Sequence, residues 1–251
     1  MLNRFAISER REVMELTNKV AIITGASSGI GAAVARNLNE AGVNLVLTGR
    51  RESRLVELKK ELNNGEVLPG DITNPALPDN LIQMALQRFG HCDIVFNNAG
   101  TVVMGTIEDI DIDEVCHMVR VNVEAAYRMA HVALKHFKSV NSGFLLNTSS
   151  IVGTKVRPTG GAYAGTKHAI EALTEGFRME LAKTNIAVAC IEPGLVQTEI
   201  FRDWDECPAA QFDIPNPLQP EDIARVVRFI LEQPDHVRIP RVLAIPADQA
   251  L

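Results

Sequence analysis

The amino-acid sequence lacks any long apolar run and is poor in aromatic side chains. No apolar stretch reaches the roughly eighteen residues that a membrane-spanning helix needs. Residues 1–16 are mixed and charged, and they lack the apolar centre of a secretory signal peptide. Aromatic residues make up only 5% of the chain, and Tyr127 and Tyr163 are its two tyrosines, so chemistry based on a phenol has two candidates. We expect a cytoplasmic protein that does not bind membranes.

Cysteine is also scarce, and the 31 acidic residues outnumber the 25 lysines and arginines. The four cysteines, Cys92, Cys116, Cys190 and Cys207, show neither close pairing nor metal-ligand spacing. The histidines His117, His131 and His136 have no metal spacing either, and we interpret them as surface or packed residues. The net charge of −6 opposes binding to nucleic acid or to an anionic membrane. We therefore expect a reducing compartment, no metal site and a small-molecule partner.

Hydrophobic residues make up 46% of the 251 residues, which is enough to bury one large core. We expect residues 1–16 to be an extension and residues 17–251 to form a single domain. Within it, apolar runs rich in β-branched residues alternate with helical patterns. The expected strands are 19–24, 44–48, 66–72, 92–96, 143–147, 186–191 and 241–245. The expected helices are 32–41, 52–62, 76–89, 111–136, 163–183 and 220–232.

This alternation predicts an α/β fold, a doubly wound seven-stranded parallel sheet of the Rossmann type with helices on both faces. Residues 199–217 break the alternation, because they contain several prolines and no sustained periodicity. A long irregular segment inside a compact domain usually serves as a lid or a binding segment. We expect this segment to be the substrate loop.

The first expected strand runs directly into a glycine-rich turn, Gly25-Ala26-Ser27-Ser28-Gly29-Ile30-Gly31, and then into a helical pattern. Backbone N–H groups at a helix start attract anions, and the missing side chains of glycine let a phosphate approach closely. This setting favours binding of a dinucleotide. The alternative is an ordinary tight turn between a strand and a helix.

The second expected strand ends in Gly49-Arg50-Arg51, where NAD-binding chains place a carboxylate for the 2′-hydroxyl of the adenosine ribose. Guanidinium groups suit a 2′-phosphate, and a carboxylate would repel it. The sequence therefore predicts NADP(H) as the cofactor. Two solvated arginines opening the next helix are the alternative.

Tyr163 is followed four residues later by Lys167 in a helical pattern, whereas Tyr127 has no lysine at that spacing. Residues four apart share a helix face, so the ammonium should stabilise a tyrosinate and lower the pKa of the phenol from about 10. Such a phenol can exchange a proton with an alcohol or carbonyl oxygen. Taken alone, the pair is equally typical of a packed helix face.

Three further positions lie where this fold type places ligands. Ser150 follows a central strand, and its hydroxyl can hold a substrate oxygen. Asp71 lies where adenine would lie, and the asparagines of Asn97-Asn98-Ala99-Gly100 can tie strands and cofactor together. Asn122 in the middle of a helical pattern indicates a kink or an exposed polar face.

From Lys19 onward these motifs together resemble the short-chain dehydrogenase/reductase family. The motifs are 24–31, 97–100, Asn122, Ser150, Tyr163 with Lys167, and Pro193-Gly194 with Val196 and Thr198. The resemblance implies the strand order 3-2-1-4-5-6-7 and a homotetramer or a homodimer. The segments 48–51, 192–194 and 245–249 are similar to the NADP-preferring branch with 3-hydroxy acid (serine-type) dehydrogenases and clavulanic-aldehyde-like reductases.

The resemblance also implies roles for individual residues. Tyr163 would be the general acid/base, Ser150 would polarise the substrate oxygen, Lys167 would lower the pKa of Tyr163, and Asn122 would support a water relay to Lys167. Ser150 and Tyr163 would bind substrate. The residues implied at the cofactor are Gly25, Ser27, Ser28, Ile30, Arg50, Arg51, Asp71, Ile72, Asn98, Ala99, Gly100, Tyr163, Lys167, Pro193, Gly194, Val196 and Thr198.

The leading hypothesis is reversible hydride transfer between NADP(H) and a small hydroxyl or carbonyl compound. A non-catalytic NADP-binding sensor or scaffold is one alternative, and an epimerase or dehydratase with tightly held cofactor is another. Lys155, Arg157 or Arg202 could receive a substrate carboxylate, or each could be a solvated surface charge.

Overall fold

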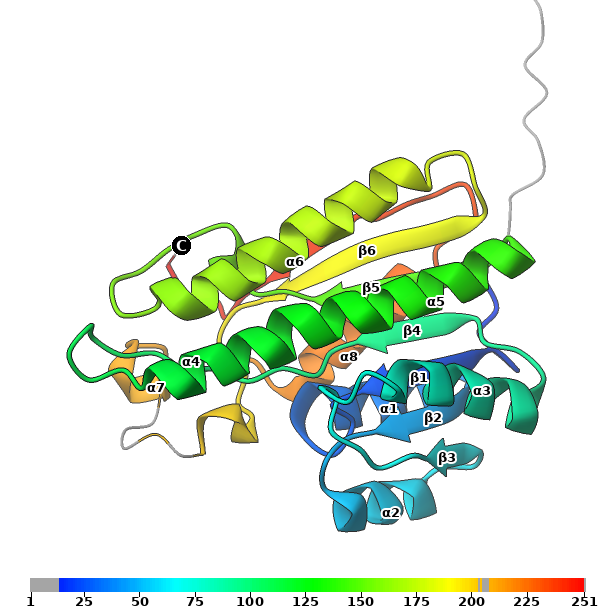
Figure 1. The fold of residues 1–251 in the computed structure, drawn as a ribbon, viewed down its shortest axis with the longest axis horizontal. Coiled ribbons are helices and arrows are strands. Elements are labelled where there is room, and N and C mark those ends of the chain that lie inside the picture. The colour runs from blue at the N-terminus through cyan, green and yellow to red at the C-terminus, as the bar shows by residue number, and fades with distance from the viewer. Residues whose placement is uncertain (1–13, 203, 205–207, 251) are drawn as a thin grey trace, which may run out of the picture.

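The computed structural model describes residues 14–202, 204 and 208–250, and it confirms the predicted α/β sheet. In the described part of the chain seven parallel strands pair in the order β3-β2-β1-β4-β5-β6-β7, as the resemblance implies (Figure 1). The strands are β1 (Val20–Thr24), β2 (Asn44–Thr48), β3 (Gly65–Val67), β4 (Ile94–Asn97), β5 (Gly143–Thr148), β6 (Ile186–Pro193) and β7 (Arg241–Ala244).

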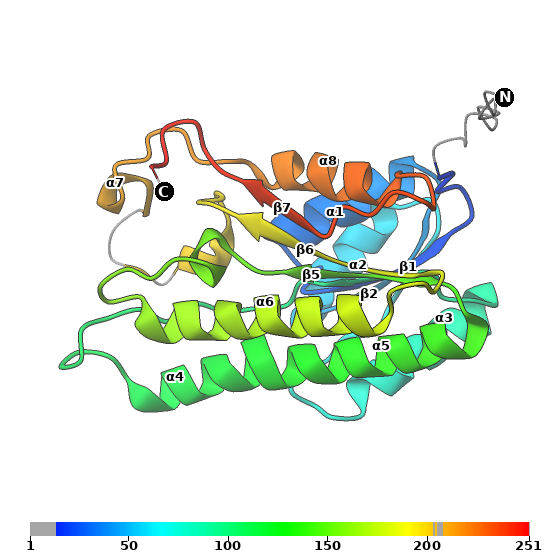
Figure 2. The same ribbon diagram turned by 90° about the horizontal axis from the view of Figure 1, so that it is seen from above.

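Helices cover both faces of this sheet (Figure 2). The α-helices are α1 (Gly29–Glu40), α2 (Glu52–Glu61), α3 (Leu77–Phe89), α4 (Ile112–Val119), α5 (Ala126–Val140), α6 (Gly161–Glu180), α7 (Pro208–Gln211) and α8 (Pro220–Leu231). Helices α1 and α8 lie together on one face, and α3, α5 and α6 lie on the other. Two apolar clusters fill the spaces between sheet and helices, as expected for a doubly wound fold.

The central strands form because their side chains are apolar on both faces. All five residues of β1 are buried, and so are all eight of β6. Each buried valine, leucine or isoleucine side chain stabilises the fold by about 1.5–3 kcal/mol relative to exposure. Strands with both faces covered are typical of parallel sheets, so the continuous apolar runs correctly predicted their position.

Strand β3 is shorter than the predicted strand 66–72. It ends at Val67, because Pro69 has no N–H to continue the ladder. The backbone still runs beside β2, since Gly70 N donates to Gly49 O at 3.1 Å. Residues 68–72 are thus an irregular segment that follows β3 and stays beside the end of β2, at the carboxyl edge of the sheet.

The predicted helix 111–136 is divided into three parts. A π-helical segment, Arg120–Ala125, separates α4 from α5 and contains Asn122, which is buried. A π-helical turn is rare and marks a functional position more often than a regular turn does. The kink that the sequence indicated is thus a widened turn, and the alternative of an exposed polar face is wrong.

The segment 199–217 has more structure than a loop. It begins with a 3₁₀ turn, Glu199–Phe201, and includes α7. Trp204 packs edge-on against Phe201, with ring centroids 4.9 Å apart, and against Phe212 at 6.4 Å. At the other end of the chain Leu16 is buried in the core, so packing begins before the predicted domain start at residue 17. Residues 1–13 of the predicted extension lie outside the described residues.

Candidate active site

A cleft with a volume of about 650 Å³ opens at the carboxyl edge of the sheet, where β1, β2, β4, β5 and β6 end. This is the size range of small-molecule and cofactor sites. With the exception of Asn122, every predicted site residue lines it. Those residues are Gly25, Ser27, Ser28, Ile30, Arg50, Arg51, Asp71, Ile72, Asn98, Ala99, Gly100, Ser150, Tyr163, Lys167, Pro193, Gly194, Val196 and Thr198.

The glycine turn after β1 leaves no space for side chains. Gly25 has a φ of +67°, and a Cβ there would lie 2.9 Å from Ala99 Cα. A Cβ on Gly31 would lie 2.4 Å from the carbonyl oxygen of Gly25. The turn leads into α1, whose first N–H groups face the cleft with the positive end of the helix dipole. This cradle fits a pyrophosphate.

Arg51 lies beside the turn and lines the cleft, but its guanidinium already has partners. It donates to the hydroxyl oxygens of Ser27 and Ser28 and forms an ion pair with Glu199. Arg54 lies 3.4 Å from the same carboxylate. The hydrogen bond from Arg51 holds the pKa of Glu199 below its usual range. The Arg51 guanidinium therefore contacts two parts of the chain: the glycine turn, through Ser27 and Ser28, and the beginning of segment 199–217, through Glu199.

Asp71 and His117 lie near each other at the far end of the cleft. The N–H and the hydroxyl of Thr73 donate to Asp71 Oδ1 at 2.9 and 2.7 Å and lower the pKa of that carboxyl. Smaller contributions to this lowering come from the charges of Arg50 and His117. The interpretation of His117 as a surface or packed residue missed its place in the cleft, because only the return of α4 to the sheet edge brings it there.

The asparagines at the end of β4, Asn97 and Asn98, tie neighbouring strands together, as predicted. Asn98 Nδ2 donates to the carbonyl oxygen of Thr24, and the Asn98 N–H donates to the hydroxyl of Thr24 at 2.9 Å. Asn97 Nδ2 donates to Asn147 Oδ1 on β5 at 3.0 Å. These bonds fix the ends of β1, β4 and β5 relative to one another and so fix the floor of the cleft.

Ser150, Tyr163 and Lys167 converge on the cleft from β5 and α6. The Ser150 and Tyr163 side chains are hydrogen-bonded to each other. Lys167 Nζ donates to the carbonyl oxygen of Thr148 at 2.9 Å and lies 5.8 Å from the centroid of the Tyr163 ring. The Ser150 hydroxyl, the Tyr163 phenol and the Lys167 ammonium thus face the same part of the cleft.

The pKa of the phenol differs from the sequence-based expectation. Burial raises the pKa of Tyr163 to about 12, although the hydrogen bond with Ser150 lowers it in part. Burial also lowers the pKa of Lys167 to about 8, against the charges of Cys190 and Glu171, which raise it. In this structure desolvation therefore outweighs any stabilisation of a tyrosinate, and the predicted lowering of the Tyr163 pKa is not observed. At neutral pH the tyrosine is a proton donor.

Asn122 lies behind the cleft wall. Its amide donates to Thr101 O at 2.8 Å and to Thr166 Oγ1 at 3.2 Å, and its Oδ1 accepts from Thr101 N at 2.8 Å. A Cβ on Gly100 would lie 3.4 Å from Asn122 Oδ1 and 3.8 Å from Lys167 Nζ. The side chain thus connects the π-helical turn to α6 and to the segment after β4.

The turn after β6 is enclosed by the C-terminal segment. A Cβ on Gly194 would lie 2.2 Å from Gln249 Oε1, which accepts from Leu195 N at 2.9 Å. Thr198 caps the 3₁₀ turn that begins at Glu199. Gln249 could not be found from the sequence, because its contact depends on the path of the chain after β7.

Of the three basic residues considered for a substrate carboxylate, Arg202 alone lines the cleft. Arg157 donates to the carbonyl oxygen of Ala250 at 3.3 Å. Ile200 and Phe201 line the cleft beside Arg202, at the start of the segment expected to bind substrate. In the described ranges there is no group of three histidine, cysteine or acidic side chains that could hold a metal ion. No helix there is both long enough and apolar enough to span a bilayer.

A glycine turn between a parallel strand and a helix, at the carboxyl edge of a doubly wound sheet, is typical of dinucleotide-binding proteins. A family model described as short chain dehydrogenase matches residues 19–208. The chain belongs to the short-chain dehydrogenase family and is an oxidoreductase of that family. The expectation that rested on the motifs is confirmed at this level.

Three similar proteins illustrate this relationship. An uncharacterized oxidoreductase of Staphylococcus aureus (strain USA300) is 38% identical over 92% of this chain and 98% of its own length. A serine dehydrogenase complexed with NADP+ has a TM-score of 0.87 at 27% identity, over 92% of this chain and 96% of that chain. An alcohol dehydrogenase from the archaeon Thermococcus sibiricus, complexed with 5-hydroxy-NADP, has a TM-score of 0.83 at 30% identity, over 93% and 98%.

Proposed function

We propose that this oxidoreductase transfers a hydride reversibly between NADP(H) and a small hydroxyl or carbonyl compound. The observation that carries the proposal is the convergence of the Ser150 hydroxyl, the Tyr163 phenol and the Lys167 ammonium on a cleft with a phosphate-type glycine turn. A proton donor beside a hydrogen-bonding hydroxyl is what reduction of a carbonyl requires.

When bound, the nicotinamide cofactor would supply the hydride for reduction of a carbonyl carbon. Ser150 holds the carbonyl oxygen by a hydrogen bond and orients it toward the phenol. Tyr163 is protonated at neutral pH, because burial raises its pKa to about 12. As negative charge develops on the substrate oxygen, Tyr163 gives it the phenolic proton. Lys167, held by Thr148 O, stabilises the tyrosinate that remains.

The preference for NADP(H) rests on the charges at the adenosine end. Arg50 and Arg51 line the cleft at the end of β2, and no carboxylate follows that strand directly. A 2′-phosphate would accept from the Arg51 guanidinium and from the Ser27 and Ser28 hydroxyls. The complexes of the serine dehydrogenase with NADP+ and of the archaeal alcohol dehydrogenase with 5-hydroxy-NADP support this choice.

The substrate class is the finer part of the proposal. The similarity to the serine dehydrogenase supports a place in the branch of 3-hydroxy acid dehydrogenases and clavulanic-aldehyde-like reductases. We further propose that the domain acts as a cytoplasmic homo-oligomer, a tetramer or a dimer, with segment 199–217 as its substrate loop. Light scattering on the purified protein measures the assembly, and a monomer would refute that part.

The direct test is a screen of aldehydes, ketones and 3-hydroxy acids for a change in the absorbance of NADPH or NADP+. Turnover with NADPH well above that with NADH is the expected result. A clear NADH advantage would contradict the role given to Arg50 and Arg51. Binding of NADPH without any turnover would identify a sensor or scaffold. Conversion of substrate without net NADPH consumption would identify an epimerase or dehydratase.

A further inference from the structure

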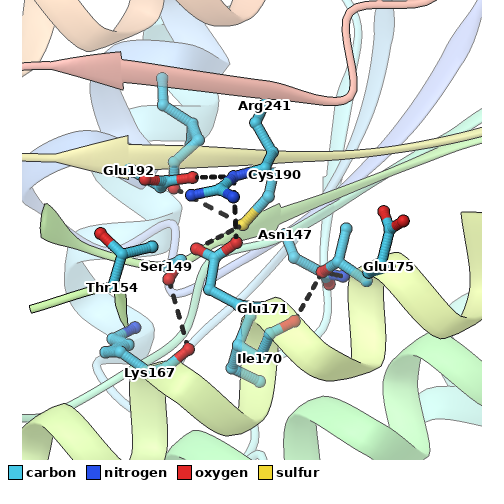
Figure 3. A network of polar contacts seen from close by, with 12 residues as sticks. Asn147, Ser149, Thr154, Lys167, Ile170, Glu171, Glu175, Cys190, Glu192 and Arg241 are labelled. Atoms are coloured by element: carbon cyan, nitrogen blue, oxygen red, sulfur yellow. Dashed lines mark hydrogen bonds and ion pairs between the residues drawn. The ribbon is translucent and has the colours of Figure 1, made fainter. Parts of the chain in front are cut away.

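A network of polar side chains lies behind the cleft, between α6 and the end of the sheet (Figure 3). Arg241 Nε on β7 lies 2.6 Å from Glu192 Oε1 on β6 and 3.5 Å from Glu171 Oε2 on α6. Cys190 Sγ lies 3.6 Å from Glu171 Oε1. One guanidinium thus binds two carboxylates that come from different elements.

The register of the sheet creates this arrangement. Cys190 pairs with Arg241 across the β6–β7 ladder, and alternation places Glu192 on the same face two residues later. Helix α6 covers that face, and its residue Glu171 comes down onto the group. The register of β6 and β7 brings Arg241 next to Glu192, and the packing of α6 on the same face of the sheet brings Glu171 next to both.

Stability alone gives little reason for such a group. Glu192 is 2% exposed, and a buried carboxylate is costly to desolvate even when it is paired. The Arg241 side chain is half exposed, and an ion pair with a solvent-exposed partner contributes little to stability, about 0–1 kcal/mol. The proton and hydride steps proposed above use none of these side chains. These side chains are better explained as contacts that hold α6, β6 and β7 in fixed positions relative to one another.

The two carboxylates lie next to the two halves of the proposed reaction site. Glu171 is one helical turn after Lys167 on α6. Glu192 directly precedes Pro193 and Gly194, which line the cleft. The turn after Ser150 also rests on this group, because a Cβ on Gly153 would lie 3.1 Å from Glu171 Oε1. The network therefore joins the helix with the proton donor to the strand that leads into the Pro193-Gly194 turn of the cleft.

We propose that Arg241, Glu171 and Glu192 are positioning residues, which hold the helix of Tyr163 and Lys167 in a fixed place relative to the Pro193-Gly194 turn. This inference rests on the proposed function. Displacement of a reacting group by about 1 Å can cost roughly a hundredfold in rate. Because the Arg241 guanidinium contacts both Glu171 on α6 and Glu192 on β6, it limits movement of α6 relative to β6.

Glu171 has a second effect, through charge. Besides the carbonyl oxygen of Thr148, which accepts from Lys167 Nζ, the titratable groups that act on the Lys167 ammonium are Tyr163 on α6, Cys190 on β6 and Glu171 itself. The charge of Glu171 raises the pKa of Lys167 against the opposing effect of burial. Glu171→Gln should therefore let Lys167 lose its proton at a lower pH, and the alkaline limb of the rate profile should move with it.

The experiment compares Arg241→Met, Arg241→Lys and Glu171→Gln with the wild type, using NADPH and a carbonyl substrate found by the screen. Arg241→Met should reduce kcat about tenfold or more, and Arg241→Lys should restore part of the loss, because an ammonium can still pair with the carboxylates. Glu171→Gln should shift the alkaline limb to lower pH. Glu180→Gln is the matched control, since it removes a carboxylate from α6 that pairs only with exposed Lys138 in the described structure.

Arg241→Met with the kcat, KM and pH profile of the wild type overturns the inference, and so does Glu171→Gln with an unmoved alkaline limb. If Arg241→Met does not fold, the pH of the alkaline limb in the Glu171→Gln rate profile tests the inference instead. If the wild type turns over no substrate, the proposed function fails and NADPH affinity becomes the readout. Arg241→Met should then weaken NADPH binding about tenfold, and unchanged binding refutes the positioning role.

Discussion

Burial of the Lys167 ammonium should make the protein more stable as the pH rises above neutral. Its pKa in the folded chain is about 8, lowered from 10.5 mainly by desolvation. The unfolded chain therefore keeps this proton between about pH 8 and pH 10.5, where the folded chain has released it. Since stability rises with pH wherever the unfolded state binds more protons, the free energy of unfolding should increase across this interval.

The magnitude follows from the two pKa values. Below pH 8 the buried ammonium costs about 3 kcal/mol of unfolding free energy relative to a lysine in water. Between about pH 7.5 and about pH 9.5 roughly 2 kcal/mol of that cost should disappear. Lys167→Met has no ammonium to titrate, so its stability relative to the wild type should fall by the same amount over this interval.

The assay is urea unfolding of the wild type and of Lys167→Met at the two pH values, followed by circular dichroism. Comparison of the two proteins cancels the titration of the groups that do not interact with Lys167. Lys138→Met is the matched control, because it removes an exposed ammonium that is paired with Glu180. An equal stability difference between the wild type and Lys167→Met at both pH values would refute the assignment of a desolvated ammonium to Lys167.

Three further substitutions test other parts of the cleft. Glu199→Gln should tighten NADPH binding about threefold to tenfold, because it frees Arg51 and removes a repelling charge, and NADH binding in a parallel titration should change little. Gly31→Ala should abolish cofactor binding and destabilise the fold by about 1–3 kcal/mol, because the new Cβ would meet Gly25 O. Its control is Gly176→Ala, where the new Cβ has open space: urea unfolding should show a stabilisation of about 0.5–1 kcal/mol. Asn122→Leu should cost about 2–4 kcal/mol in the same assay, because the N–H and C=O of Thr101 lose their partner, and an unchanged midpoint would contradict that account.

The strands could be predicted well because the physics that forms them is local. A buried parallel strand such as β1 or β6 reads as a continuous apolar run, and nothing distant is needed to recognise it. Strand β3 was predicted too long because Leu68 and Ile72 extend the apolar pattern, whereas the ladder with β2 ends at Val67. The π-helical turn at Asn122 was seen only as a conflict with helix propensity, since its widened geometry depends on contacts with Thr101 and Thr166.

Residues of the candidate site were predictable where a short local segment, a turn or a helix, carries its own sequence signature. The glycine turn and the tyrosine with lysine at plus four belong to this group. Partners from distant parts of the chain were missed, because no local pattern marks them. Glu199 reaches Arg51 across 148 positions, and Arg241 joins Glu171 and Glu192 only through the register of β7. The pKa of Tyr163 was predicted in the wrong direction because the helix spacing shows the cation and does not show the burial.

The central claim is that the phenol of Tyr163 donates the proton during hydride transfer. The most direct measurement is kcat for Tyr163→Phe with NADPH, together with the affinity of the same variant for NADPH. We predict a loss of about a hundredfold to ten-thousandfold in kcat with nearly unchanged NADPH affinity, because only the phenolic oxygen is removed. A Tyr163→Phe variant that retains most of the wild-type turnover would contradict the claim.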